Sequence, residues 1–120
     1  MEARTAVSAL SALAHEGRLG IFRLLVQAGP EGLAAGEIAR HTGILPNTLS
    51  ANLNILSAAG LVRSRRVSRS IIYSAEYVRM TELLTFLMED CCSANSEICT
   101  PLVDVLAKAA CCLPPELADA

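Results

Sequence analysis

Apolar residues recur at helical spacing through the first half of the chain. This periodicity predicts four helices, over residues 5–14, 17–28, 35–42 and 46–59. The second carries a stripe made of Leu19, Phe22, Leu25 and Val26. In the fourth, Leu49, Leu53 and Leu56 stand four and three positions apart, which predicts one buried face. Glycine at position 43 is predicted to end the short third helix.

The pattern then changes from helical spacing to short β-branched runs. Residues 61–66 and 70–74 predict two strands joined by a turn at 67–69. Residues 76–90 return to helix, with apolar side chains along one side at Tyr77, Met80, Leu83, Leu84, Leu87 and Met88. A last, weaker helix is predicted at 102–110. The expected fold class is therefore mainly α with one small β-hairpin.

Composition narrows the class of protein. A chain of 120 residues fits one compact domain, and its 52% hydrophobic residues include only four aromatic ones. The uncharged apolar stretches are too short for a membrane span, so we expect a cytoplasmic protein without membrane association. Net charge is uneven, at +4 over residues 1–75 and −6 over residues 76–120.

The order of two helices, a short helix, a turn, a helix and a hairpin is that of a winged helix-turn-helix. The helix at 46–59 would face double-stranded operator DNA with polar or small residues, namely Asn47, Thr48, Ser50, Ala51, Asn52 and Asn54. Taken alone, this set also fits the solvated face of an ordinary surface helix. The hairpin that follows favours DNA, because Arg65, Arg66 and Arg69 can neutralise backbone phosphates there.

Four segments resemble the ArsR/SmtB family of metalloregulatory repressors. Leu10–Leu19 (LSALAHEGRL) is similar to its LADPTRL opening, and Gly36–Ala39 (GEIA) to its ELA helix. Thr48–Leu56 (TLSANLNIL) resembles its STVSHHLKVL recognition helix, and Ala59–Arg66 (AGLVRSRR) with the later Ile72-Tyr73 resembles its wing. The resemblance implies a homodimeric repressor, not an enzyme. Its first and fifth helices would pack across the two-fold axis, and its two recognition helices would read a pseudo-palindromic operator.

The chain departs from that family in two places. The paired His and Lys of the family's recognition helix are replaced by Ala51, Asn52 and Asn54, which leaves more of the electrostatics to the wing. The Cys-Val-Cys motif of the founding arsenic repressors is absent from the short helix, which holds no thiol. An inducer site, if the chain has one, must therefore lie elsewhere.

All five cysteines lie in the acidic part of the chain, at positions 91, 92, 99, 111 and 112. An odd count with two adjacent pairs is a poor disulfide framework, and clustered thiols in a reducing compartment more often bind metals. Cys91, Cys92 and Cys99 can converge at a helix end as three soft thiolates. Such a site suits As(III), with Sb(III) as a second candidate, and a CC pair followed by a third Cys resembles the arsenic-responsive branch of the family.

These assignments divide the chain into a DNA-binding and dimerisation domain at 1–92 and a cysteine-containing segment at 93–120. Cys111 and Cys112 are an accessory pair: a second site, a dithiol that captures the metalloid first, or part of a tail. His15 and His41 are isolated, which favours structural or surface roles for both.

Three alternatives for the cysteines stay open. They could be small apolar residues at a dimer seam. They could form a thiol redox or persulfide sensor, or bind Cd, Pb or Zn, on the same fold. A thiol-dependent arsenate reductase is disfavoured, because no cysteine is followed by an oxyanion loop ending in Arg.

Overall fold

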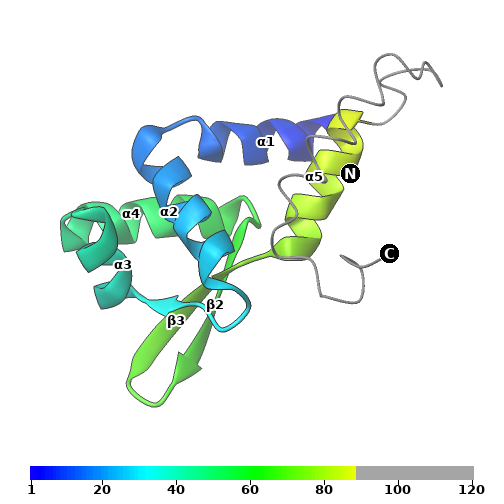
Figure 1. Cartoon of the computed structure of the whole chain (residues 1–120). Coiled ribbons are helices and arrows are strands. Elements are labelled where there is room, and N and C mark those ends of the chain that lie inside the picture. Colours follow the sequence, from blue (N-terminus) through cyan, green and yellow to red (C-terminus); the bar gives the residue numbers. More distant parts are fainter. Residues whose placement is uncertain (89–120) are drawn as a thin grey trace, which may run out of the picture. The chain divides into compact units, whose positions relative to one another are not determined.

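The computed structural model describes residues 1–88 (Figure 1). Its elements are α1 (Ala3–Leu13), α2 (Glu16–Ala28), β1 (Leu33–Ala34), α3 (Ala35–Thr42), α4 (Pro46–Ala58), β2 (Val62–Val67), β3 (Ser70–Ala75) and α5 (Tyr77–Met88). This order confirms the predicted winged helix-turn-helix, with helices dominating and one hairpin. Residues 1–86 form one compact unit. The predictions for the helix at 102–110 and for all five cysteines fall outside the described residues.

Helix boundaries follow from local chemistry. His15 precedes α2 and its Nδ1 accepts a hydrogen bond from the backbone N–H of Arg18 at 3.3 Å, which satisfies a free donor of the first turn. α3 ends at Thr42 and is capped by Gly43, whose φ of 72° is left-handed and whose N–H donates to the Ala39 carbonyl at 2.8 Å. The predicted stop at Gly43 is confirmed.

The hairpin of β2 and β3 is part of a three-stranded antiparallel sheet with strand order β1-β3-β2. Val62 pairs with Ala75 at its base and Val67 with Ser70 beside the turn. β1 was not predicted, since two residues are too few to show a period. It pairs Leu33 with Tyr73, and the preceding Gly32, with a φ of 74°, lies so close to the Tyr73 carbonyl that any side chain would collide.

The core lies where α2, α3 and α4 meet the base of the sheet. Leu49, Leu53 and Leu56 of α4 are all buried, as their spacing predicts. The predicted stripe of α2 was wrong in one position. Leu19 is exposed, and Ile21 is buried in the core with Phe22 and Leu25. Three alanines of α1 are also buried, namely Ala6, Ala9 and Ala12. Within residues 1–88, no helix is long and apolar enough to cross a membrane.

Leu53 tests the importance of this core. The side chain is 1% exposed, so Leu53→Ala should lower the free energy of unfolding by about 3 kcal/mol through reduced burial and the cavity left behind. Urea denaturation at one fixed protein concentration measures the change. Ile55→Ala is the matched control on the same helix. Its side chain is 43% exposed, and we expect a cost below about 1 kcal/mol. Equal costs for the two variants would contradict this account of the core.

Candidate nucleic-acid interface

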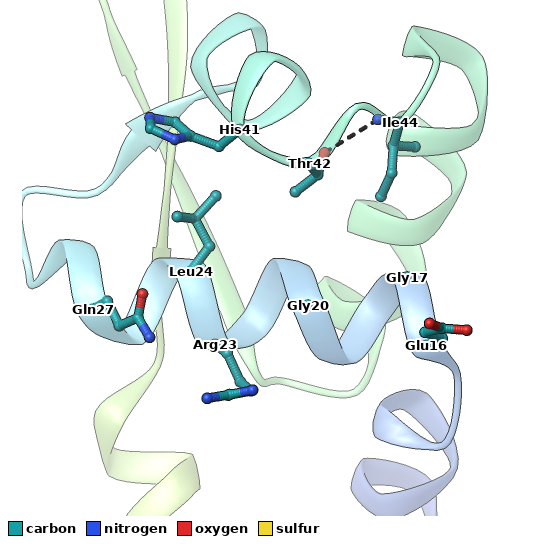
Figure 2. Close-up of a pocket in the computed structure, with 9 residues that line it drawn as sticks. All are labelled: Glu16, Gly17, Gly20, Arg23, Leu24, Gln27, His41, Thr42 and Ile44. Carbon is teal, nitrogen blue, oxygen red and sulfur yellow. Dashed lines mark hydrogen bonds between the residues drawn. The ribbon is translucent and has the colours of Figure 1, made fainter.

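The turn between α3 and α4 is held by Thr42. Its hydroxyl donates to the Ile38 carbonyl at 2.8 Å and accepts from the backbone N–H of Ile44 at 3.3 Å, the dashed line in Figure 2. Pro46 then opens α4 at a first-turn position, where its missing N–H breaks no helical hydrogen bond. These constraints set the direction in which α4 leaves the turn, which is the defining geometry of a helix-turn-helix.

Five of the six residues predicted to face DNA from α4 are exposed, namely Asn47, Thr48, Ser50, Ala51 and Asn54. The opposite face of the helix is anchored in the core by its leucines. The exposed face offers amides and hydroxyls, which can donate to and accept from base edges and phosphates. Its contact with DNA stays a prediction.

Asn52 does not belong to that face, and the prediction that it contacts DNA was wrong. Its side chain is 5% exposed, and Nη1 of Arg18 lies 3.5 Å from its Oδ1. The reason is angular: on an ideal helix Asn52 lies within about 60° of Leu49 and about 40° of Leu56, so it turns inward with them. A helical projection would have found this.

Arg18 is a residue that sequence reasoning missed. Its Nε donates to the Ala12 carbonyl at 2.6 Å, while its Nη1 reaches Asn52. One side chain therefore joins the end of α1, the start of α2 and the middle of α4. Nδ2 of Asn52 is buried without a hydrogen-bond partner in the described part of the chain, beside Gly17 and the ring of His15.

The hairpin, which we call the wing (residues 62–75), carries four arginines in two groups. Near the tip, Nε of Arg66 donates to the Ser68 carbonyl at 3.4 Å, and Arg69 is exposed in the turn. Farther from the turn, Nη2 of Arg65 donates to the Glu31 carbonyl at 2.8 Å, and Nε of Arg63 to Oγ of Ser74 at 3.3 Å. Arg65 is exposed, but its hydrogen bond to Glu31 holds it against the loop before β1.

No carboxylate neutralises these wing arginines within the described part of the chain. Among residues 1–88 the ion pair is Arg79–Glu82, at 3.8 Å and within α5. Four uncompensated guanidinium groups therefore lie on one short hairpin. Such a surface attracts phosphates through a local field, whatever the net charge of the whole chain.

A groove of about 460 Å³ runs between α2 and the end of α3 (Figure 2). Gly17 and Gly20 line the groove on α2 without side chains, while Leu24 points toward His41. Glu16 and His41 lie toward opposite ends of it. Within residues 1–88, no group of three His, Cys, Asp or Glu side chains could hold a metal. The predicted ligands Cys91, Cys92 and Cys99, with Cys111 and Cys112, lie outside the described residues, so the inducer site stays a prediction.

Comparison with known proteins bears on the class. Residues 13–65 match a helix-turn-helix domain model. The HTH-type transcriptional regulator YgaV of Escherichia coli is 31% identical over 90 residues, which cover 75% of this chain and 89% of that protein. An ArsR-like transcriptional regulator from a Rhodococcus species superposes with a TM-score of 0.67 and 25% identity, covering 81% of this chain and 89% of the other.

A third relative is the homodimeric winged helix-turn-helix DNA-binding domain of Mb0332 from Mycobacterium bovis, described as a possible ArsR-family regulator. It is 34% identical with a TM-score of 0.58, and the match covers 72% of this chain and 80% of that domain. Fold, turn geometry and relatives define a winged helix-turn-helix transcriptional regulator, a class that is not enzymatic. The chain belongs to the ArsR family of these regulators.

The tip of the wing yields a test of DNA binding. Arg66→Gln combined with Arg69→Gln should weaken operator binding and flatten its dependence on salt. Each phosphate that is no longer neutralised makes the negative slope of log K against log salt shallower by about 0.9, or about 3.6 for the four arginines removed from a dimer. Fluorescence anisotropy of a labelled duplex at several salt concentrations measures the slope.

The control for this test removes two charges elsewhere. Arg4→Gln combined with Arg23→Gln changes exposed arginines of α1 and α2. This variant should keep the wild-type slope. An equal reduction in both double variants would show that only net charge matters, and would contradict a specific role for the wing.

Proposed function

We propose that this protein is a homodimeric repressor that binds a pseudo-palindromic operator and releases it when As(III) binds Cys91, Cys92 and Cys99. One observation carries the proposal. The fold places a complete helix-turn-helix and wing before residue 76, without a thiol, while all five cysteines follow residue 90. The residues proposed to bind DNA and the cysteines proposed to bind the inducer are therefore separated along the chain, with α5 between them.

Dimer formation is supported by unpartnered apolar side chains on α1 and α5. Val7 is 60% exposed and Val78 66%, and Leu10 and Leu84 are exposed on the same two helices. Apolar surface left on two helices of a small domain favours association. The homodimeric state described for the Mb0332 domain supports a dimer here. Two copies would present two recognition helices, which matches the symmetry of a palindromic operator.

The proposed inducer chemistry is a ligand exchange without electron transfer. Arsenous acid gives up three As–O bonds and forms three As–S bonds, and the three thiol protons leave with the hydroxyls as water. Soft thiolates favour soft ions, and the lone pair of As(III) leaves room for a three-coordinate sulfur pyramid. Sb(III) has the same geometry and remains the second inducer in this proposal.

Coupling to DNA is supported by the way α5 begins. The backbone N–H of Glu76 donates to the Leu61 carbonyl at 2.8 Å, and the Tyr77 hydroxyl donates to the Val26 carbonyl at 3.1 Å. The guanidinium of Arg79 lies directly over Gly60, where an added Cβ would be 2.9 Å from its Nε. The start of α5 is thus joined to α2, to the segment before β2 and to the end of the recognition helix.

Ligand binding must favour the released state by a sufficient margin. Moving a dimer from almost fully bound to almost fully released requires roughly 5 kcal/mol of differential affinity. Three metalloid–sulfur bonds made only in the released conformation can supply it. In this proposal the strain enters beyond the end of α5 and reaches α4 through the contacts at Leu61 and Gly60.

The triple variant Cys91→Ser, Cys92→Ser, Cys99→Ser tests the sensing site. A labelled promoter fragment from upstream of the gene is first bound by the protein, and arsenite is then added while anisotropy is followed. Wild-type protein should release the DNA, and the triple variant should bind it equally well but stay bound. The matched control is Cys111→Ser with Cys112→Ser, which should still release.

Parallel titrations with antimonite, Cd²⁺, Pb²⁺, Zn²⁺ and hydrogen peroxide identify the inducer. Mass spectrometry of the released protein distinguishes a bound metalloid from a disulfide. Arsenite release by the triple variant would contradict the proposed site. Release by peroxide but not by arsenite would contradict the proposed inducer and favour the redox alternative.

The contact over Gly60 predicts a variant that is uncoupled. Arg79→Ala should leave DNA affinity without inducer close to that of wild type, because Arg79 lies on α5 and not on the recognition helix or the wing. It should reduce the fraction of DNA released at saturating arsenite, which anisotropy measures. Glu82→Gln is the control, since it removes the ion pair but leaves Arg79 over Gly60. Full release by Arg79→Ala would contradict this coupling route.

A further inference from the structure

Leu45 is the most exposed of the large hydrophobic side chains described in residues 1–88, at 73%. It does not pack against the core cluster, although its neighbour Ile44 does. It lies in the turn between α3 and α4, directly before the first residue of the recognition helix. Burial within the protomer therefore does not stabilise this side chain.

Leu45 also occupies a position where helices favour a polar residue. Its backbone is the N-cap of α4, with φ −65° and ψ 148°, and its carbonyl accepts from the N–H of Leu49 at 2.8 Å. Ser, Thr, Asp or Asn there would also cap the helix with a side-chain oxygen. Leu45 makes no such bond. The side chain therefore stabilises neither the core nor the helix end.

The surroundings of Leu45 indicate what it meets. Asn47 and Thr48, both exposed, follow it on the first turn of α4, the part of a recognition helix that reaches base edges in the major groove. Figure 1 shows this first turn at the end of α4 away from α5. Leu45 is thus separate from the apolar faces of α1 and α5 assigned to the dimer.

We propose that Leu45 is a specificity-determining residue that packs on the 5-methyl group of a thymine in each operator half-site. The thymine methyl is the apolar group that base pairs present in the major groove, so it is the matching partner for a leucine side chain there. The inference rests on the proposed DNA binding, but not on arsenic sensing. It adds an apolar contact to the five exposed residues of α4 predicted to face DNA, which offer amides, hydroxyls and methyl groups.

The contribution of one buried methyl group sets the expected effect. Removing it should weaken binding about fourfold per half-site, and about fifteenfold for an operator with two equivalent half-sites. Uracil is thymine without that methyl and keeps the same hydrogen-bonding groups. Uracil substitution therefore isolates the proposed contact from all polar readout.

Selection from random duplex libraries tests the proposal on whatever operator sequence the protein prefers. Wild-type full-length protein selects from one library made with thymidine and one made with deoxyuridine. We expect a strongly preferred thymine in each half-site of the first library, and no preference at that position in the second. Leu45→Met, which keeps an apolar side chain, should retain the thymine preference in part.

Leu45→Ser separates recognition from folding. The serine can cap α4, so thermal unfolding should occur at the same or a higher temperature than in wild type. The variant should nevertheless bind thymine and uracil forms of the selected duplex equally. A thymine preference that persists in Leu45→Ser, or an equal preference for uracil at that position in the deoxyuridine library, would overturn the role of Leu45. Failure of wild-type protein to enrich any sequence would instead overturn the proposed DNA binding itself.

Discussion

The buried leucine face of α4 is the constraint on which the rest of the structure depends. Leu49, Leu53 and Leu56 anchor one side of the helix between α2, α3 and the sheet. Because the helix cannot rotate without exposing them, its opposite side is committed to solvent. Apolar burial is not directional by itself. It therefore determines which side of α4 faces the core more firmly than it determines the tilt of the helix axis. Arg18 supplies direction, because its bonds to Ala12 and Asn52 join α4 to the corner between α1 and α2.

Local signals were sufficient for most of the fold. Helical spacing, Gly43, Pro46 and the switch to short strands predicted α1 to α5 and the hairpin, because each depends on neighbours within a few residues. Features set by distant partners were missed. β1 exists because Leu33 and Ala34 pair with β3 some forty residues later. Ile21 rather than Leu19 is buried because α3 and α4 determine which side of α2 is covered.

Five of six polar or small positions on α4 were placed correctly on the exposed face. The placement of Asn52 on this face was wrong because amino-acid type was given more weight than the angular position of the residue on the helix.

The chain separates its electrostatic functions along its length. Arg63, Arg65, Arg66 and Arg69 are concentrated on the wing, while α4 from Pro46 to Ala58 contains no Lys or Arg. A neutral recognition helix contributes little to nonspecific attraction, so the proposed DNA complex relies on the wing for more of its phosphate binding. This division makes α4 more sensitive to shape and to individual base contacts than a basic helix would be.

A neutral recognition helix also affects how release can work. Phosphate contacts on a hairpin are long-ranged and tolerate small shifts, whereas short side chains such as Asn47 and Thr48 lose their partners when a helix moves by about an ångström. Specific affinity therefore depends most on the position of α4, whose far end at Gly60 lies under Arg79 of α5. A modest displacement at that end changes the specific contacts before the nonspecific ones. In the proposed mechanism, the uncharged α4 is thus the helix whose displacement through α5 would change specific DNA affinity most effectively.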